Sequence, residues 1–175
     1  MPDRHCPTMP QVTAVDGQFG THRFVDETQD KLAGKWVYLY RAIDQFGQVI
    51  DVLVSQKRDL GATRRFFTRA LEQAPRPSEV CTDQAPAYLR VVDELLPAAC
   101  HVMEQYANNP VEADHGRLKA RLRPMRGLKR LRSARVISAG HAFVQNIRRG
   151  HYELGIDLDP RHRLPAAFAE LAIAI

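Results

Sequence analysis

Three acidic residues of this 175-residue chain stand where a carboxylate can do chemistry. Asp26 lies inside an apolar segment, Asp83 ends a second β-prone segment, and Glu112 falls in the first turn of an expected helix. Carboxylate oxygens suit Mg²⁺ or Mn²⁺, and two such ions about 4 Å apart would activate a hydroxyl and stabilise the leaving oxygen of a phosphodiester. On spacing alone, solvated surface acids and a Glu112 that only favours a helix N-terminus remain the simpler interpretation.

Basic side chains follow Glu112 along the chain. Lys119 lies about two helical turns after Glu112, and Arg123 one turn further, so an acid and two cations share one helix face. Residues 112–150 contain 11 Lys and Arg against 2 acids, whereas the rest of the chain is acidic on balance. This excess favours a polyanionic partner, with a solvated charge run as the alternative. The candidate contact residues are Lys119, Arg117, Arg121, Arg123, Arg126, Lys129 and Arg130.

The hydrophobic pattern excludes an integral membrane protein, because no uninterrupted apolar run approaches the roughly 20 residues that span a bilayer. Residues 1–20 contain no apolar stretch behind a basic start, so no export signal is visible and we expect a cytoplasmic protein. With 45% hydrophobic residues, the chain is long enough for one domain with a substantial core.

Hydrophobic periodicity predicts an α/β fold in which three antiparallel strands precede alternating helices and strands. The second strand is apolar on both faces and is therefore expected at the centre of the sheet. Asp59 is predicted to cap the first helix, Asn109 the third and Ser133 the fourth. The predicted strands cover 23–32, 35–43, 48–56, 79–82 and 98–104, and the predicted helices cover 60–73, 85–96, 110–123, 134–149 and 166–175.

This order of elements positions the acids. Short connections place the middle of strand 23–32 beside the end of strand 79–82, so Asp26 and Asp83 should converge. Helix 110–123 would bring Glu112 to them as a third ligand if its apolar stripe packs on the sheet. Glu27 and Asp114 are expected to be supporting or surface groups rather than ligands. The stripe consists of Val111, His115, Leu118, Leu122 and Met125.

With these residues in view, the chain resembles the catalytic domain of DDE-class insertion-sequence transposases, most closely the IS-six type. The resemblance runs from about residue 23 to residue 152. Its motifs are Val-Asp-Glu-Thr at 25–28, Gly-Lys-Trp-Val-Tyr-Leu-Tyr-Arg-Ala-Ile-Asp at 34–44, Thr-Asp-Gln-Ala-Pro-Ala-Tyr at 82–88, Asn-Asn-Pro-Val-Glu-Ala-Asp-His-Gly-Arg-Leu-Lys at 108–119 and Arg-Pro-Met-Arg-Gly-Leu-Lys at 123–129.

The resemblance implies a ribonuclease H-like fold and assigns Asp26, Asp83 and Glu112 as the catalytic acids that bind two Mg²⁺ or Mn²⁺ ions. It implies that Lys119 contacts transposon-end DNA and that the neighbouring cations bind DNA. The implied chemistry is hydrolysis that frees a 3′-hydroxyl at the element's end, followed by attack of that hydroxyl on target DNA. A homodimer or higher assembly on DNA is also implied, since two ends must be joined.

The expected domain organisation has three parts. Residues 1–20 form a poorly ordered lead-in without the helix-turn-helix region that family members use to recognise terminal repeats. Residues 21–152 form the ribonuclease H-like catalytic domain, and residues 153–175 form a tail with a short helix. The missing region leaves a second hypothesis, an inactive transposase remnant that only binds DNA; a cellular nuclease of the same fold is a more distant third.

Overall fold

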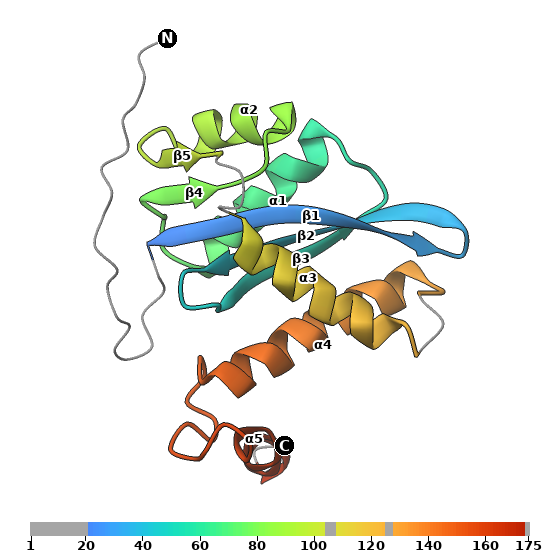
Figure 1. Ribbon diagram of the computed structural model, residues 1–175, viewed down its shortest axis with the longest axis vertical. Coiled ribbons are helices and arrows are strands. Elements are labelled where there is room, and N and C mark those ends of the chain that lie inside the picture. The colour runs from blue at the N-terminus through green and yellow to red at the C-terminus, as the bar shows by residue number, and fades with distance from the viewer. Residues whose placement is uncertain (1–20, 104–107, 125–127, 174–175) are drawn as a thin grey trace.

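The strands of the computed structural model form one mixed sheet with the order β3-β2-β1-β4-β5 in the residues that it describes, 21–103, 108–124 and 128–173 (Figure 1). The first three strands are antiparallel, and β4 runs parallel to β1 and β5. β2 is an interior strand, but the middle position, at which the sequence places it, is held by β1. The strands are β1 (His22–Leu32), β2 (Lys35–Asp44), β3 (Val49–Ser55), β4 (Glu79–Cys81) and β5 (Cys100–Val102).

Two turns with glycine at positive φ fold β1, β2 and β3 into the predicted meander. Gly34 has a φ of 84° in the first turn and Gly47 has a φ of 80° in the second, a conformation that glycine adopts without steric cost. A carboxylate oxygen of Asp44 accepts hydrogen bonds from the backbone N–H groups of Phe46 and Gln48, both at 2.9 Å. The Asp44 side chain therefore closes the second turn.

Helices cover both faces of the sheet (Figure 1). The first pair packs on the face that carries Val25 and Tyr40, and the second pair packs on the face that carries Val37 and Leu39. The last helix contacts α4. The bounds are α1 (Leu60–Gln73) and α2 (Pro86–Leu95) on one face, α3 (Asn109–Leu122) and α4 (Leu131–Arg149) on the other, and α5 (Arg163–Ile173) beside α4.

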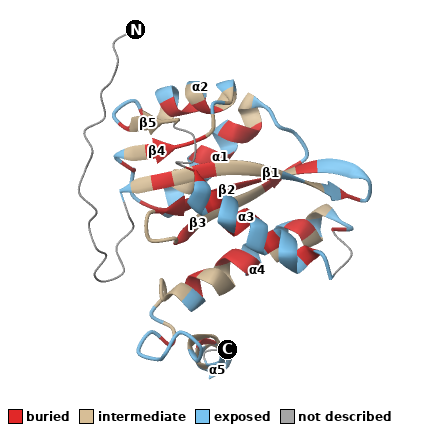
Figure 2. Ribbon diagram, in the orientation of Figure 1, coloured by how far each residue is buried: buried red, intermediate tan, exposed pale blue. Residues whose placement is uncertain are grey.

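The core consists of two layers separated by the sheet (Figure 2). Successive β2 residues alternate between the layers, as the pleat of a strand requires. Tyr40 contacts the Phe66 ring of α1, with 5.7 Å between ring centroids, while Leu39 belongs to the cluster that contains Leu118 of α3. Because both layers are apolar, β2 is buried on both faces and its neighbour β1 is fixed in register.

The predicted elements are confirmed with small shifts at their ends. Asn108, rather than Asn109, precedes α3 as its N-cap residue. Helix α4 begins at Leu131 after Arg130, so the prediction that Ser133 caps it is wrong; Ser133 lies within the helix. The shift at its start leaves the apolar stripe of α3 in place, since Val111, Leu118 and Leu122 are buried.

Some predictions fall on residues that the structure does not describe. The expected lead-in, 1–20, lies outside the described residues, as do Met125 of the apolar stripe and Arg126 of the basic set. Among the described residues, no helix combines the length and hydropathy needed to cross a membrane.

Candidate active site

Parallel pairing of β1 with β4 brings Asp26 and Asp83 together, as predicted. Phe24 of β1 pairs with Cys81 of β4, and each aspartate lies two residues beyond this pair on its own chain segment. Asp26, Asp83 and Glu27 each offer one carboxylate oxygen within 4.8 Å of the others. Asp83 is fixed by its own loop, because its Oδ1 accepts a hydrogen bond of 3.0 Å from the backbone N–H of Ala85.

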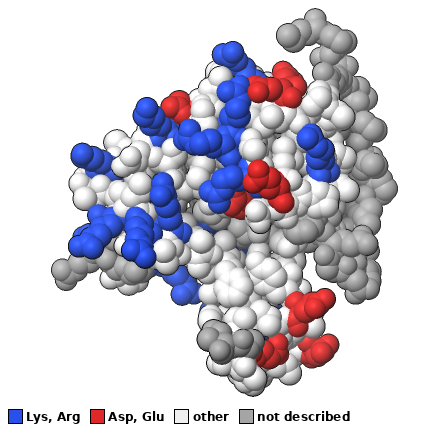
Figure 3. Space-filling model, turned by 180° about the vertical axis from the view of Figure 1, so that it is seen from behind, with Lys and Arg blue, Asp and Glu red and all other residues white. Residues whose placement is uncertain are grey.

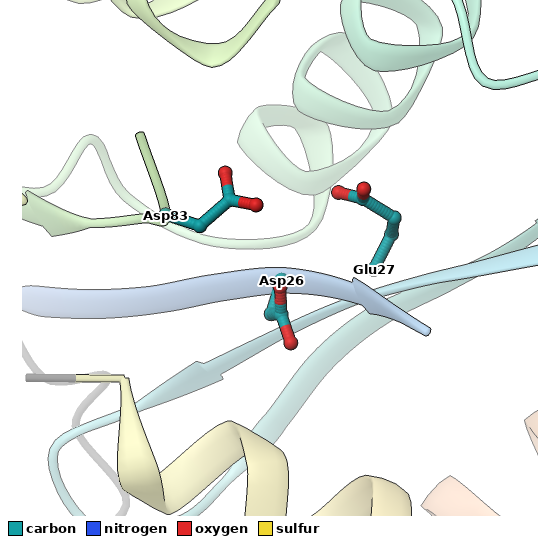
Figure 4. A group of neighbouring side chains, drawn as sticks. All are labelled: Asp26, Glu27 and Asp83. Atoms are coloured by element: carbon teal, nitrogen blue, oxygen red, sulfur yellow. The ribbon is translucent and has the colours of Figure 1, made fainter. Parts of the chain in front are cut away.

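The Asp26 carboxyl lies in a poorly solvated, acidic environment. Its side chain is 17% exposed and points from β1 toward α3 (Figure 4). Burial, followed by the charges of Glu27 and Asp83, raises its pKa to about 7, and the charge of Glu112 contributes in the same direction. A bound cation would relieve the repulsion among these acids.

Glu112 itself lies in the first turn of α3, as predicted, with an exposed side chain. Asn108 fixes this end of the helix, because its side-chain amide donates a 2.8 Å hydrogen bond to the carbonyl oxygen of Val25, the residue before Asp26. Within the described residues, the 4.8 Å group of acids does not include Glu112. The structure thus joins two of the three predicted acids directly and places the third on the adjacent helix end.

His115, one turn after Glu112, faces the same carboxylate. Its Nε2 lies 3.8 Å from Oδ2 of Asp26, and the residue is 4% exposed. Burial, with a further contribution from the charge of Arg41, lowers the His115 pKa to about 3, so the ring is neutral near pH 7. The prediction that His115 belongs to the buried stripe is confirmed.

A buried ionic network holds α3 on the sheet. Asp114 is fully buried and pairs with Arg41 of β2, which is also fully buried. Arg149 at the end of α4 binds the other Asp114 oxygen at 2.7 Å, and Arg117 approaches it at 3.5 Å. Burial alone would raise the Asp114 pKa, but the guanidinium groups of Arg41 and Arg149 hold it below its usual value. Asp114 is therefore a supporting group, as expected.

Glu27 is more deeply involved than the sequence suggested. Its side chain is 5% exposed, lies on the β1 face opposite Asp26 (Figure 4), and accepts a hydrogen bond from the Tyr88 hydroxyl. Arg58 forms an ion pair with it and reaches Oδ2 of Asp83 at 3.7 Å. The sequence did carry a signal for Glu27: it lies two residues after Val25, so both point to the same face of β1, the face that α1 and α2 cover. Arg58 carried no comparable signal.

The predicted basic residues lie along α3 and beyond it. Lys119, Arg123 and Lys129 line a hollow of about 540 Å³ together with Lys31 of β1. Lys119 is about 10 Å from Glu112 along the helix axis, from the rise of 1.5 Å per residue. Figure 3 shows the molecule from behind. Lys and Arg gather on one side of this view, while acids lie at the lower end of the molecule, where Figure 1 places α5. The exposed members of the predicted set are Arg117, Lys119, Arg121, Arg123, Lys129 and Arg130.

The donor set fits a divalent cation. Hard carboxylate oxygens from β1 and the end of β4 lie close enough to share one ion. Burial and then the charges of Glu27 and Asp83 raise the pKa of Asp26, and a bound cation would favour its ionised form. Asp26 and Asp83 are the residues that would hold a metal, because Glu27 is already engaged by Tyr88 and Arg58.

The amino-acid sequence matches a known protein family over most of its length. Residues 20–151 match the protein family described as a DDE domain. The chain belongs to this family. The transposase for the insertion sequence-like element IS431mec of Staphylococcus aureus (strain Mu50) is 38% identical to the DDE domain over 102 residues, which cover 55% of this chain and 46% of the relative. The chain thus spans about half the length of the curated relatives that it matches.

Solved structures confirm the ribonuclease H-like fold of this DDE domain. The simian T-cell lymphotropic virus intasome, in complex with a PP2A regulatory subunit, superposes with a TM-score of 0.58 at 20% identity, over 78% of this chain and 52% of that one. The HTLV-2 integrase catalytic core, in complex with magnesium, superposes with a TM-score of 0.53 at 22% identity, over 62% of this chain and 72% of that one. At these identities, the likeness shows the fold alone.

Proposed function

We propose that this DDE domain catalyses metal-dependent cleavage and strand transfer of DNA for an insertion element. The observation that carries the proposal is the meeting of Asp26 of β1 and Asp83 just after β4, with Glu112 presented on the end of α3 that Asn108 fixes beside them. The family and the transposase relatives support the same activity. Residues 21–152 would be the catalytic unit, working on DNA in the cytoplasm.

Asp26, Asp83 and Glu112 would hold two Mg²⁺ or Mn²⁺ ions in the working enzyme. When bound, such ions activate a water or a 3′-hydroxyl and stabilise the leaving oxygen of the phosphodiester. The protein's own contribution is to position the acids: the β1–β4 register sets the first two, and the Asp114 network with the Asn108 hydrogen bond sets the third. Asp26 must be ionised to act as a ligand. Burial and then the charges of Glu27 and Asp83 raise its pKa and oppose this ionisation, and a bound cation would favour it.

DNA binding would use the cationic surface that begins on α3. Lys119 and Arg123 line the hollow. Because Lys119 lies about 10 Å from Glu112 along the helix axis, it would contact the backbone of a strand whose scissile phosphate lies at the carboxylates. The remaining basic residues, Arg117, Arg121, Arg126, Lys129 and Arg130, would extend the contact along the backbone. Joining two element ends requires two active sites, so we propose a homodimer or higher assembly on DNA.

A nicking and strand-transfer assay with Mg²⁺ or Mn²⁺ on labelled element-end DNA tests the proposal. We expect Glu112→Gln and Asp83→Asn to lose product by about 10³-fold or more while DNA binding persists. Glu94→Gln is the control: it removes an exposed acid of α2 that pairs with Arg64, and it should retain activity. Wild-type binding without cleavage in either metal would instead identify a protein that only binds DNA.

A further inference from the structure

Arg58 lies beside the acids, although it is far from the basic segment in sequence. It occupies the connection between β3 and α1, whereas the run of cations begins at Arg117. Its Nε pairs with Glu27 Oε1, and its Nη2 lies 3.7 Å from Asp83 Oδ2. One guanidinium therefore touches two of the three carboxylates that share the 4.8 Å group.

The connection that carries Arg58 is fixed on both sides. Before it, the backbone N–H of Lys57 donates to the Ser55 hydroxyl at 3.1 Å. After it, Asp59 caps α1 and accepts a 2.7 Å hydrogen bond from the backbone N–H of Ala62. Glu27 then orients the side chain, and Glu27 is itself held by the Tyr88 hydroxyl. The guanidinium is thus positioned in advance, with little side-chain entropy left to lose on binding a ligand.

Arg58 also keeps the means to bind an anion. Its side chain is 52% exposed, in contrast to the 5% exposure of Glu27. A guanidinium has five N–H donors in a planar fork that matches two oxygens of a phosphate, and it carries its charge at every physiological pH. A buried structural ion pair would leave no such accessible surface.

We propose that Arg58 is a DNA-contacting residue of the active site, which binds the phosphate group placed at the Asp26 and Asp83 carboxylates. The proposal rests on the proposed function for its substrate, DNA. In the free protein, Arg58 offsets part of the negative charge of Glu27 and Asp83. With DNA bound, its outer donors face the phosphate oxygens, while its Nε contact with Glu27 keeps it in place.

DNA affinity, measured without turnover, is the first test. The probe is a short fluorescein-labelled duplex in Ca²⁺ buffer, titrated by anisotropy at several KCl concentrations, since backbone contacts require no particular sequence. Arg58→Ala should reduce the slope of log affinity against log salt by about 0.9, the value of one phosphate contact. Arg58→Lys should restore the slope. Arg64→Ala, which removes a cation from an exposed α1 pair with Glu94, should leave the slope unchanged.

Manganese affinity of the free protein separates a DNA contact from a purely structural role. If Arg58 serves DNA, Arg58→Ala should bind Mn²⁺ at least as tightly as wild type, because a cation next to Asp83 has been removed. If Arg58 only orients Asp83, the variant should bind Mn²⁺ about tenfold more weakly and keep the wild-type salt slope. That result, or an unchanged slope in Arg58→Ala, would overturn the proposal.

The third test is the rate of DNA cleavage by the Arg58 variants. Arg58→Ala should lower the cleavage rate at saturating DNA by about 10²–10³-fold, the usual effect of removing one donor from a developing charge. Arg58→Lys should recover only part of the rate, since an ammonium lacks the fork. If wild-type protein cleaves no DNA while the salt slopes still differ as expected, the proposed catalytic function fails and the Arg58 contact stands.

Discussion

Neutralising Asp114 should destabilise the fold far more than its single charge suggests. Asp114 and Arg41 are both fully buried, so both charged groups lose their hydration when the chain folds. Asp114→Asn preserves the shape but leaves Arg41 without its counter-charge, and Arg149 loses a 2.7 Å partner. Removing one member of a buried ion pair costs about 3–5 kcal/mol. For a domain of this size, that corresponds to a melting temperature lower by roughly 10 °C.

Urea denaturation followed by far-ultraviolet circular dichroism measures this loss. Arg117→Met is the matched control, because Arg117 contacts the same carboxylate at 3.5 Å but is 54% exposed; we expect less than about 1 kcal/mol from it. The double variant Arg41→Met with Asp114→Leu should regain most of the stability, since an apolar pair leaves no buried charge. An Asp114→Asn protein within about 1 kcal/mol of wild type, with an unchanged m-value, would refute the reasoning.

Three further predictions concern α4. The Asn146 amide accepts from and donates to the backbone of Val49 at 2.7 and 2.8 Å, so Asn146→Ala should cost about 2–3 kcal/mol by leaving two buried groups unpaired, measurable by urea denaturation. Gly150 ends the helix at a φ of +78°, so Gly150→Ala should lower the melting temperature, whereas Gly140→Ala, in the open helix interior, should raise it. Burial, followed by the charge of Arg41, lowers the His141 pKa to about 4, so the ring is neutral when folded and protonation favours unfolding. The stability of wild type relative to His141→Gln should therefore fall by about 3 kcal/mol from pH 7 to pH 4, and a pH-independent difference would contradict this.

Local chemistry in the sequence determined the elements and part of the site. Apolar residues on both faces of segment 35–43 predict a strand covered on both sides, and β2 (Lys35–Asp44) is covered on both sides from Val37 onward. The first helix, predicted over 60–73 with Asp59 as its cap, is confirmed residue for residue. The meeting of Asp26 and Asp83 also followed from element order, because short connections leave few ways to arrange the strands.

The supporting contacts were decided only by the tertiary structure. Arg41 and Asp114 are 73 residues apart in sequence, and Arg58 reaches Glu27 of β1 from the connection between β3 and α1. Neither pairing is encoded in a local period, because each depends on which strand lies beside which and on how far a long side chain extends across the pleat. A sequence fixes which residues form each strand and helix through short-range propensity and alternation; the partners of its charged side chains are set by packing, which brings distant segments within reach.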